Sequence, residues 1–204
     1  MECYIADTHF GHTQILEECR PQFKTIEEMN ETIINNINRK MTRNDTLYIL
    51  GDFAYRSKTP PIEFLKAIKP KKVLILGNHD AWVKKLTDEE KKKYIIGGVH
   101  NELRIKKNGI ELYLCHYPRL AWNRSHYFGT TFSICGHIHD RKDGAIAAEL
   151  FPFVKNQFNA GVDINNYEPV TFEELIKNNT RFYQRSYTDN ELEILQDAIK
   201  RLSK

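Results

Sequence analysis

A chain of 204 residues with 41% hydrophobic content is long enough for one large domain with a sizeable core. Its 30 basic residues are nearly balanced by 27 acidic ones, so the net charge of +3 argues against a chain built mainly to bind nucleic acid. No apolar run approaches the roughly 18 residues that a membrane span needs. An apolar run that begins at Cys3 argues against a signal peptide. We therefore expect a single domain over residues 1–204, in the reducing cytoplasm and without a membrane partner.

The first half of the chain alternates between predicted strands and predicted helices. Short apolar runs predict three strands, over residues 2–6, 46–50 and 72–76. Thr25 and Glu28 form a capping-box pattern before apolar residues at helical spacing, which predicts a helix over residues 26–42. Two consecutive prolines open a shorter helix over residues 60–68. This alternation predicts a largely parallel sheet that is covered by helices.

The second half carries more strand patterns. Asn108 and Gly109 separate two apolar runs and predict a β-hairpin over residues 103–115. Further runs predict two strands and a helix, at residues 132–135, 158–162 and 172–178. A second capping-box pattern starts at Thr188 and predicts an appended C-terminal helix over about residues 189–203. The apolar face of this helix could pair with a second chain, so a homo-oligomer is one expectation. The overall pattern indicates an α/β protein with two sheets.

Five apolar runs end in a short polar cluster that contains Asp, Asn or His. The clusters are Asp7-Thr8-His9, Gly51-Asp52, Gly77-Asn78-His79-Asp80, His116 and Gly136-His137-Ile138-His139. For any one cluster, turn chemistry is an adequate explanation. Together they indicate a site, because neighbouring parallel strands bring their carboxyl ends to one edge of a sheet. Carboxylate, amide and imidazole groups without a thiolate suit a divalent cation such as Mn, Fe, Zn or Ni, and the set is large enough for two.

In this order, the five clusters resemble the motifs of the calcineurin-like metallophosphoesterase superfamily. The stretches DTHFGH and CHYPRLAWNRSH further resemble its small, single-domain bacterial and phage members. The resemblance covers residues 7–139 and weakens beyond residue 140. It implies a four-layer α/β/β/α sandwich, with two mixed sheets and helices outside. It also implies two divalent metal ions as cofactors, with Mn²⁺ as the expected ion and Fe, Zn or Ni as alternatives.

The resemblance assigns a role to each Asp, Asn and His residue of these clusters. One metal ion would take Asp7, His9, Asp52 and His139, and the second would take Asp52, Asn78, His116 and His137, so that Asp52 bridges them. His79 is not a ligand in this pattern; it would face the scissile phosphate and stabilise or protonate the leaving oxygen. Asp80 would orient the His79 imidazole, with an ordinary helix cap as the alternative.

Four other residues are candidates for supporting roles. His12 could contact substrate or pack a loop. Arg119 and Arg124 could form a pocket wall that binds phosphate, or belong to a surface loop. Asp163 is interpreted as a turn residue, with an ordering role for the loop near the site as the alternative.

The resemblance implies a phosphohydrolase in which two cations activate a bridging hydroxide for in-line attack on phosphorus. Only about 65 residues follow the last cluster, which leaves no room for a capping domain. The metal edge should then be open, which favours a phosphodiesterase that acts on a small phosphate ester such as a nucleotide. A phosphomonoesterase and a nuclease acting on DNA or RNA ends are alternatives; the near-neutral charge weighs against the nuclease. A catalytically dead scaffold is a further alternative, although every ligand position is filled.

Overall fold

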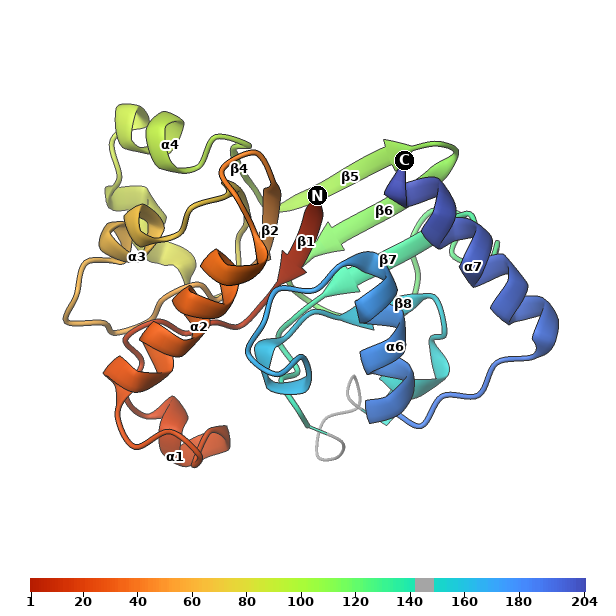
Figure 1. Ribbon diagram of the computed structural model, residues 1–204, viewed down its shortest axis with the longest axis horizontal. Coiled ribbons are helices and arrows are strands. Elements are labelled where there is room, and N and C mark those ends of the chain that lie inside the picture. The colour runs from red at the N-terminus through yellow and green to blue at the C-terminus, as the bar shows by residue number, and fades with distance from the viewer. Residues whose placement is uncertain (142–148) are drawn as a thin grey trace.

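The computed structural model describes residues 1–141 and 149–204, which form two four-stranded sheets flanked by helices (Figure 1). The first sheet has the order β1-β2-β3-β4, and its strands are β1 (Glu2–Ile5), β2 (Thr46–Leu50), β3 (Lys71–Ile75) and β4 (Val99–His100). All of its strand pairs are parallel. The two-sheet α/β fold class is therefore confirmed, with the first sheet parallel throughout rather than mixed.

The connections of the first sheet are helical. They contain α1 (Ile15–Cys19), α2 (Ile26–Lys40), α3 (Pro61–Ala67), the 3₁₀ helix η1 (Asp80–Lys85) and α4 (Asp88–Tyr94). Helix α2 begins where the capping pattern predicts, because the Thr25 side chain accepts a hydrogen bond from the Glu28 backbone. Met29, Ile33 and Ile37 of α2 are buried against the outer face of the sheet. Alternate strand residues thus point toward α2, as the pleat requires.

The second sheet is mixed and has the order β5-β6-β7-β8. Its strands are β5 (Glu102–Lys107), β6 (Ile110–Cys115), β7 (Thr131–Cys135) and β8 (Gln157–Asn159). The β5–β6 pair is the predicted antiparallel hairpin, and the other two pairs are parallel. Asn108 and Gly109 at its turn have φ values of +48° and +78°, the left-handed conformation that an Asn-Gly turn supplies.

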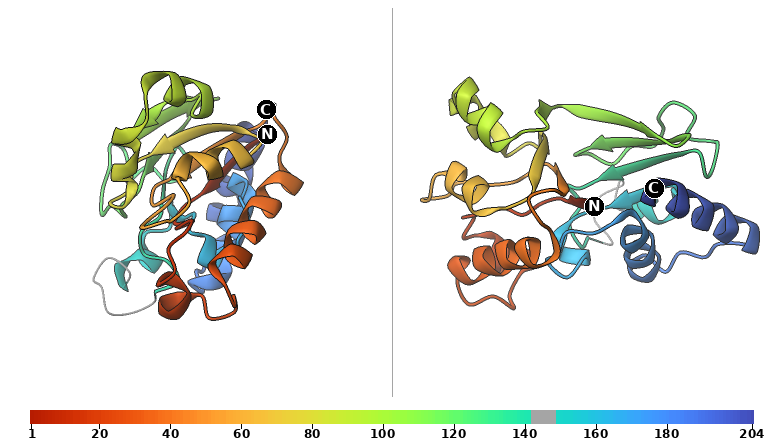
Figure 2. Two further views of the ribbon diagram at one scale, coloured as in Figure 1. Left: turned by 90° about the vertical axis from the view of Figure 1, so that its left-hand side faces the viewer. Right: turned by 45° about the horizontal axis from the view of Figure 1, so that its top comes forward.

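The C-terminal part consists of η2 (Phe151–Phe153), η3 (Val162–Ile164), α6 (Phe172–Phe182) and α7 (Asp189–Ser203). Helices α6 and α7 cover the second sheet (Figures 1 and 2). Leu195, Ala198 and Leu202 of α7 join the core that both sheets share. Most of the apolar face of α7 therefore packs within this chain, although Leu192 is 44% exposed, and pairing with a second chain stays a prediction. Among the described helices, none is long and apolar enough to cross a membrane.

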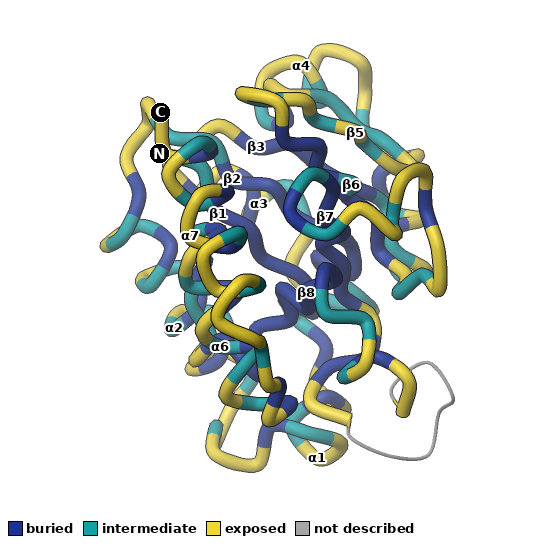
Figure 3. The backbone as a smooth tube through the Cα atoms, turned by 90° about the vertical axis from the view of Figure 1, so that its right-hand side faces the viewer, coloured by how far each residue is buried: buried dark blue, intermediate teal, exposed yellow. Residues whose placement is uncertain are grey.

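The two sheets meet where β1 ends. The Ala6 N–H donates to the Ala160 carbonyl oxygen at 2.9 Å, and the Val162 N–H donates to the Ala6 carbonyl oxygen at 3.1 Å. These bonds explain why β8 ends at Asn159 rather than at residue 162, since the following residues turn to the end of β1. Most strands of both sheets are buried, whereas the edge strand β5 alternates between exposed and half-buried residues (Figure 3). The result is a seam between the sheets at the carboxyl ends of the parallel strands. Met1 and Lys204 line a hollow at the opposite, amino ends.

Candidate metal centre

The seven candidate metal ligands all follow the carboxyl ends of strands. Asp7 and His9 follow β1, Asp52 follows β2, Asn78 follows β3, His116 follows β6, and His137 and His139 follow β7. They lie at the seam, so ligands from both sheets meet. Gly51 and Gly77 permit this convergence, since an added Cβ would lie 2.4 Å from the His116 ring and 2.3 Å from the Asp52 carboxylate, respectively.

The first group of donor atoms comes from Asp7, His9 and His139, and these atoms lie within 4.8 Å of one another. Both ring nitrogens of His9 lack a hydrogen-bond partner, although the residue is only 2% exposed. A buried polar atom without a partner is unfavourable by about 1–3 kcal/mol. A cation at this position would provide the missing partner, so these residues fit a metal site.

The second group comes from Asp52, His116 and His137, also within 4.8 Å of one another. Nδ1 of His116 donates to the Leu50 carbonyl oxygen at 2.9 Å, so a neutral ring presents Nε2 as an acceptor. Yet Nε2 lies 3.0 Å from another acceptor, Oδ1 of Asn78. Either a proton or a metal ion on Nε2 would join these two atoms. The structure therefore brings Asn78 to the group in which the sequence placed it.

Asp52 lies between the two groups. Its Oδ2 is 3.6 Å from His9 Nε2 and 3.5 Å from His116 Nε2. Burial raises the pKa of Asp52, but the hydrogen bond and charge of His116 outweigh this effect and lower it to about 2. The carboxylate is thus ionised and within reach of both groups. One carboxylate in this position can serve two cations.

Burial also shifts the pKa values of other candidate ligands. It raises the pKa of Asp7 to about 6 and lowers the pKa of His9 to about 2 and that of His137 to about 4. These shifts disfavour an ionised carboxylate and protonated imidazoles. A bound divalent cation would keep the Asp7 carboxylate ionised and the imidazoles neutral, because metal ligands must be deprotonated.

Five of the seven candidate ligands have left-handed backbone conformations. The φ values are +56° for Asp7, +49° for His9, +51° for Asp52, +74° for His137 and +50° for His139. Non-glycine residues rarely adopt this conformation, and such strain is concentrated at functional sites. The strand-end motifs do not reveal this feature, because nothing in the residue types requires it.

His139 is positioned by a buried ion pair that the sequence analysis missed. Asp163 in η3 accepts a hydrogen bond from His139 Nδ1 at 2.8 Å and another from Arg20 Nε at 2.7 Å. Arg20 is fully buried, and its guanidinium also donates to the carbonyl oxygens of Thr8 and Asp7. Asp163 is therefore an ordering residue, and its interpretation as a simple turn residue is wrong. No local pattern marks Arg20.

This ion pair also sets the electrostatics of His139. Burial lowers the pKa of His139, but the hydrogen bonds to Asp163 and Cys19 and the neighbouring carboxylates outweigh burial and raise it to about 10. The Asp163 bond occupies Nδ1 and leaves Nε2 for the site. The same negative charge that favours a proton on this ring favours a cation at Nε2.

The expected contact between Asp80 and the His79 ring is not present among the described residues. The Asp80 carboxylate instead accepts four hydrogen bonds of 2.8–3.0 Å, from the backbone N–H groups of Asp52, Phe53 and Gly77 and the indole of Trp82. It is also no side-chain cap, since the N-cap of η1 is His79. Both interpretations of Asp80 were wrong: it joins the loop after β2 to the loop after β3.

His79 lies next to Asp52 but belongs to neither ligand group. Its N–H donates to Asp52 Oδ1 at 2.9 Å, and its side chain is 27% exposed. The ring contacts Tyr55, with the ring centroids 3.8 Å apart. His79 is thus anchored through its backbone to the central carboxylate, and its ring has access to solvent.

The three candidate substrate-binding residues lie in different environments. His12 is 6% exposed and packs between the rings of His9 and Tyr55, so its position favours loop packing. Arg119 pairs with Glu102 and lines a groove beside the site. Arg124 lies over the exposed ring of Tyr127, in the surface loop that was the alternative.

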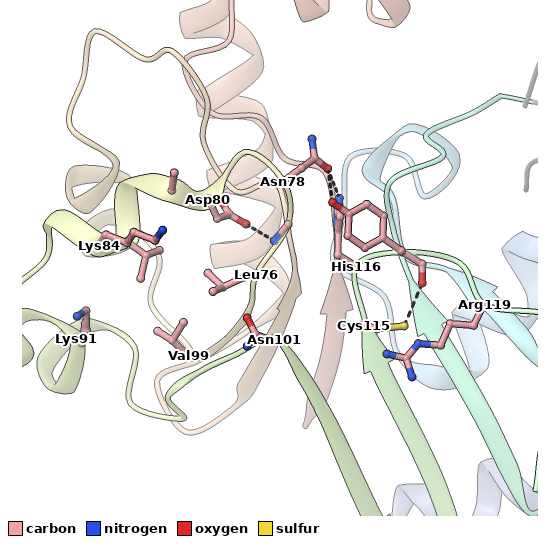
Figure 4. Close-up of a pocket in the computed structure, with 14 residues that line it drawn as sticks. Leu76, Asn78, Asp80, Lys84, Lys91, Val99, Asn101, Cys115, His116 and Arg119 are labelled. Atoms are coloured by element: carbon pink, nitrogen blue, oxygen red, sulfur yellow. Dashed lines mark hydrogen bonds between the residues drawn. The ribbon is translucent and has the colours of Figure 1, made fainter. Parts of the chain in front are cut away.

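Two grooves border the site. The larger, of about 630 Å³, lies beside Asn78 and His116 (Figure 4). The smaller, of about 460 Å³, lies beside His79 and Tyr55. They contact different lysines of η1, since Lys84 lines the larger groove and Lys85 lines the smaller one. We call them the Asn78 groove and the His79 groove.

The chain is similar to several known proteins. The chain is 30% identical over 178 residues to an uncharacterized protein of Methanocaldococcus jannaschii, a match that covers 85% of this chain and 88% of that one. It is 34% identical over 80 residues to the gene 66 protein of Mycobacterium phage L5, with 38% of each chain covered. The crystal structure of an Aquifex aeolicus protein of unknown function has a similar fold, with a TM-score of 0.62 and 27% identity over 87% of this chain and 98% of that one.

The comparison with protein families identifies the chain more directly. The model of the calcineurin-like phosphoesterase family matches residues 3–141, which include all seven candidate ligands and His79. Members of this family hydrolyse phosphoesters with the help of metal ions, and the donor groups described above can hold them. The protein is therefore a member of the calcineurin-like phosphoesterase family.

Proposed function

We propose that the protein is a phosphodiesterase with two divalent metal ions, and that Mn²⁺ is the ion it uses best. The position of Asp52 carries this proposal. Its Oδ2 lies 3.6 Å from the His9 ring in one ligand group and 3.5 Å from the His116 ring in the other. A single carboxylate at this distance from both groups is what a two-metal site requires.

The two ligand groups would each hold one ion. Asp7, His9 and His139 form the first site, Asn78, His116 and His137 form the second, and Asp52 belongs to both. When bound, two divalent cations would make a water molecule nucleophilic at neutral pH and neutralise charge on the phosphoryl group. Asn78 would bind through a neutral oxygen, so it would leave more positive charge for the phosphate.

His79 would act on the leaving group. Its backbone is held by Asp52, and its partly exposed ring lines the His79 groove. A proton donated by the imidazole would neutralise the negative charge that develops on the leaving oxygen. Because Asp80 does not contact this ring, the orientation of His79 would depend on its contacts with the rings of Tyr55, His9 and His12.

The two grooves favour a diester over a monoester. A phosphodiester has two ester arms, and the site has one groove on the Asn78 side and one on the His79 side. A monoester would need only one of them. The substrate would be a small phosphate ester such as a nucleotide, with a nucleic-acid end as the alternative. The four cysteines are unpaired, which agrees with our proposal that the protein acts in the cytoplasm.

The decisive experiment compares bis(p-nitrophenyl) phosphate with p-nitrophenyl phosphate in the presence of Mn²⁺, Fe²⁺, Zn²⁺ or Ni²⁺. We expect kcat/KM for the diester to be at least equal to that for the monoester, with the highest value in Mn²⁺ and none after EDTA treatment. Turnover confined to the monoester would show a phosphomonoesterase. The absence of turnover with every ion would favour a scaffold that has lost catalysis.

A further inference from the structure

The Asn78 groove extends away from the candidate metal centre, and most of the residues that line it belong to neither ligand group. Asn78 and His116 line it beside the candidate metal centre, and Leu76 and Val99 form apolar parts of its surface (Figure 4). Val83 also lines it. Lys84 of η1 and Lys91 of α4 lie on one side, and Arg119 lies on the other. A groove with apolar surface and several cations suits an organic group that carries an anion.

Of the Lys84, Lys91 and Arg119 side chains that line this groove, two are paired with carboxylates. Asp80 is the one acidic residue that lines it among the described residues, and its oxygens already accept four hydrogen bonds. Arg119 is paired with Glu102, and Lys91 lies 3.5 Å from Asp88. Within the described part of the chain, Lys84 has no carboxylate within 4 Å. Lys84 is therefore the cation that is most available to a ligand.

The position of His79 decides which arm of the substrate enters this groove. His79 lines the other groove, so the leaving group of the proposed reaction lies on that side. The arm that stays on phosphorus is then directed toward the Asn78 groove. Lys84 would meet a group on the retained arm, beyond the scissile phosphate.

We propose that the Asn78 groove binds a second phosphate on the retained arm of the substrate, and that Lys84 is its main ligand. This inference rests on the proposed function, and it narrows the substrate class to nucleotide esters that carry another phosphate. Both a phosphorylated mononucleotide and a nucleic-acid strand have this chemistry. The apolar residues of the groove would contact the nucleoside that joins the two phosphates.

The test uses a pair of chromogenic esters that share one leaving group. Thymidine 5′-(p-nitrophenyl phosphate) is compared with the same ester carrying a 3′-phosphate, and the readout is the ratio of their kcat/KM values. We expect the 3′-phosphate to raise kcat/KM about tenfold, the order of one charge-assisted hydrogen bond in a solvated groove. Lys84→Gln should reduce this ratio to about 1. A thymidine trinucleotide with the same ester distinguishes the sources, because a further gain indicates a strand.

Lys85→Gln is the matched control. Lys85 is the next residue of the same 3₁₀ helix, it carries the same charge, and it lines the other groove. The ratio should therefore keep its wild-type value in Lys85→Gln. An equal decrease in both variants would show a general effect of surface charge, and a ratio near 1 in the wild type would show no second-phosphate site. Either result overturns the proposal.

A binding measurement separates this proposal from the proposed function. Calorimetric titration in EDTA compares thymidine 3′,5′-bisphosphate with thymidine 5′-phosphate and does not depend on turnover. Tighter binding of the bisphosphate that is lost in Lys84→Gln but retained in Lys85→Gln would support the groove assignment even if no ester were hydrolysed. Equal binding of the two nucleotides, together with a kcat/KM ratio near 1, would refute the assignment while the phosphodiesterase proposal stood.

Discussion

At the scale of single residues, Asp52 has the largest number of roles in the site. Its Oδ2 faces both ligand groups, and its Oδ1 accepts the His79 N–H at 2.9 Å. Asp52→Asn keeps the shape and removes the charge, so both sites should lose their ions together. We expect elemental analysis to show fewer than one ion per chain, with kcat/KM reduced at least about 100-fold. A variant with two ions and most of its activity would contradict the two-metal assignment.

His79 allows a test that separates catalysis from metal binding. His79→Ala should retain both ions, because the ring belongs to neither ligand group. We expect turnover to fall by about 10²–10⁴-fold for esters with alkyl leaving groups. The decrease should be much smaller for p-nitrophenyl esters, since p-nitrophenolate leaves without protonation. An equal loss for both kinds of ester would remove the proton-donor role and leave only electrostatic stabilisation.

At the scale of secondary-structure elements, the Arg20–Asp163 pair joins the end of α1 to η3 beneath the site. Both side chains are almost completely buried, at 0% and 1% exposure. Asp163→Ala leaves the Arg20 charge without a partner, so we expect a loss of about 3–5 kcal/mol in the free energy of unfolding. Urea denaturation measures this loss.

The exposed pair between Arg39 and Glu168 provides the control for that experiment. Glu168→Ala should change the free energy of unfolding by less than about 1 kcal/mol. Equal effects of the two substitutions would show that the buried pair does not support the structure near His139.

The elements that were predictable from sequence are those with local signals. The capping patterns at Thr25 and Thr188 place the starts of α2 and α7, and Asn108-Gly109 places the hairpin. Helix α1 has five residues and β4 has two, too few for a periodic pattern, and both were missed. The extension of α6 to Phe182 was also missed; Asn179 is buried there and bonds to Asn159, a contact that no local pattern announces.

The candidate site was likewise predictable only where its residues stand in local sequence motifs. The sequence alone singles out the candidate ligands, because they stand in short motifs at strand ends. The Arg20–Asp163 pair was not, because its two residues are 143 positions apart in the chain. Asp80 was misread because its partners, the backbone N–H groups of two loops, are brought together only by the fold. Sequence motifs thus identify donors of the site, and the contacts that orient them depend on tertiary structure.

At the scale of the whole molecule, the candidate ligands connect the two sheets. Asp7, Asp52 and Asn78 come from the first sheet, and His116 and His137 come from the second. Metal binding should therefore stabilise the whole fold. At an ion concentration 100 times Kd the gain is about 2.7 kcal/mol, which corresponds to roughly 5–10 °C in Tm for a chain of this size. Thermal unfolding with Mn²⁺ and with EDTA measures it, and Asp52→Asn should show little difference between the two conditions.

At the five candidate ligands with a left-handed backbone, the side chains that suit metal binding are the ones that the backbone conformation disfavours. Glycine adopts this conformation without steric strain, yet it can hold no metal. At Asp7, His9, Asp52, His137 and His139 the chain keeps side chains that its own backbone geometry disfavours. Engineering for thermal stability at these positions would favour glycine, and the candidate metal-binding side chains would then be lost first. A relative that no longer needed catalysis could accept glycine at these five positions. Glycines there would then indicate that the relative has lost its activity.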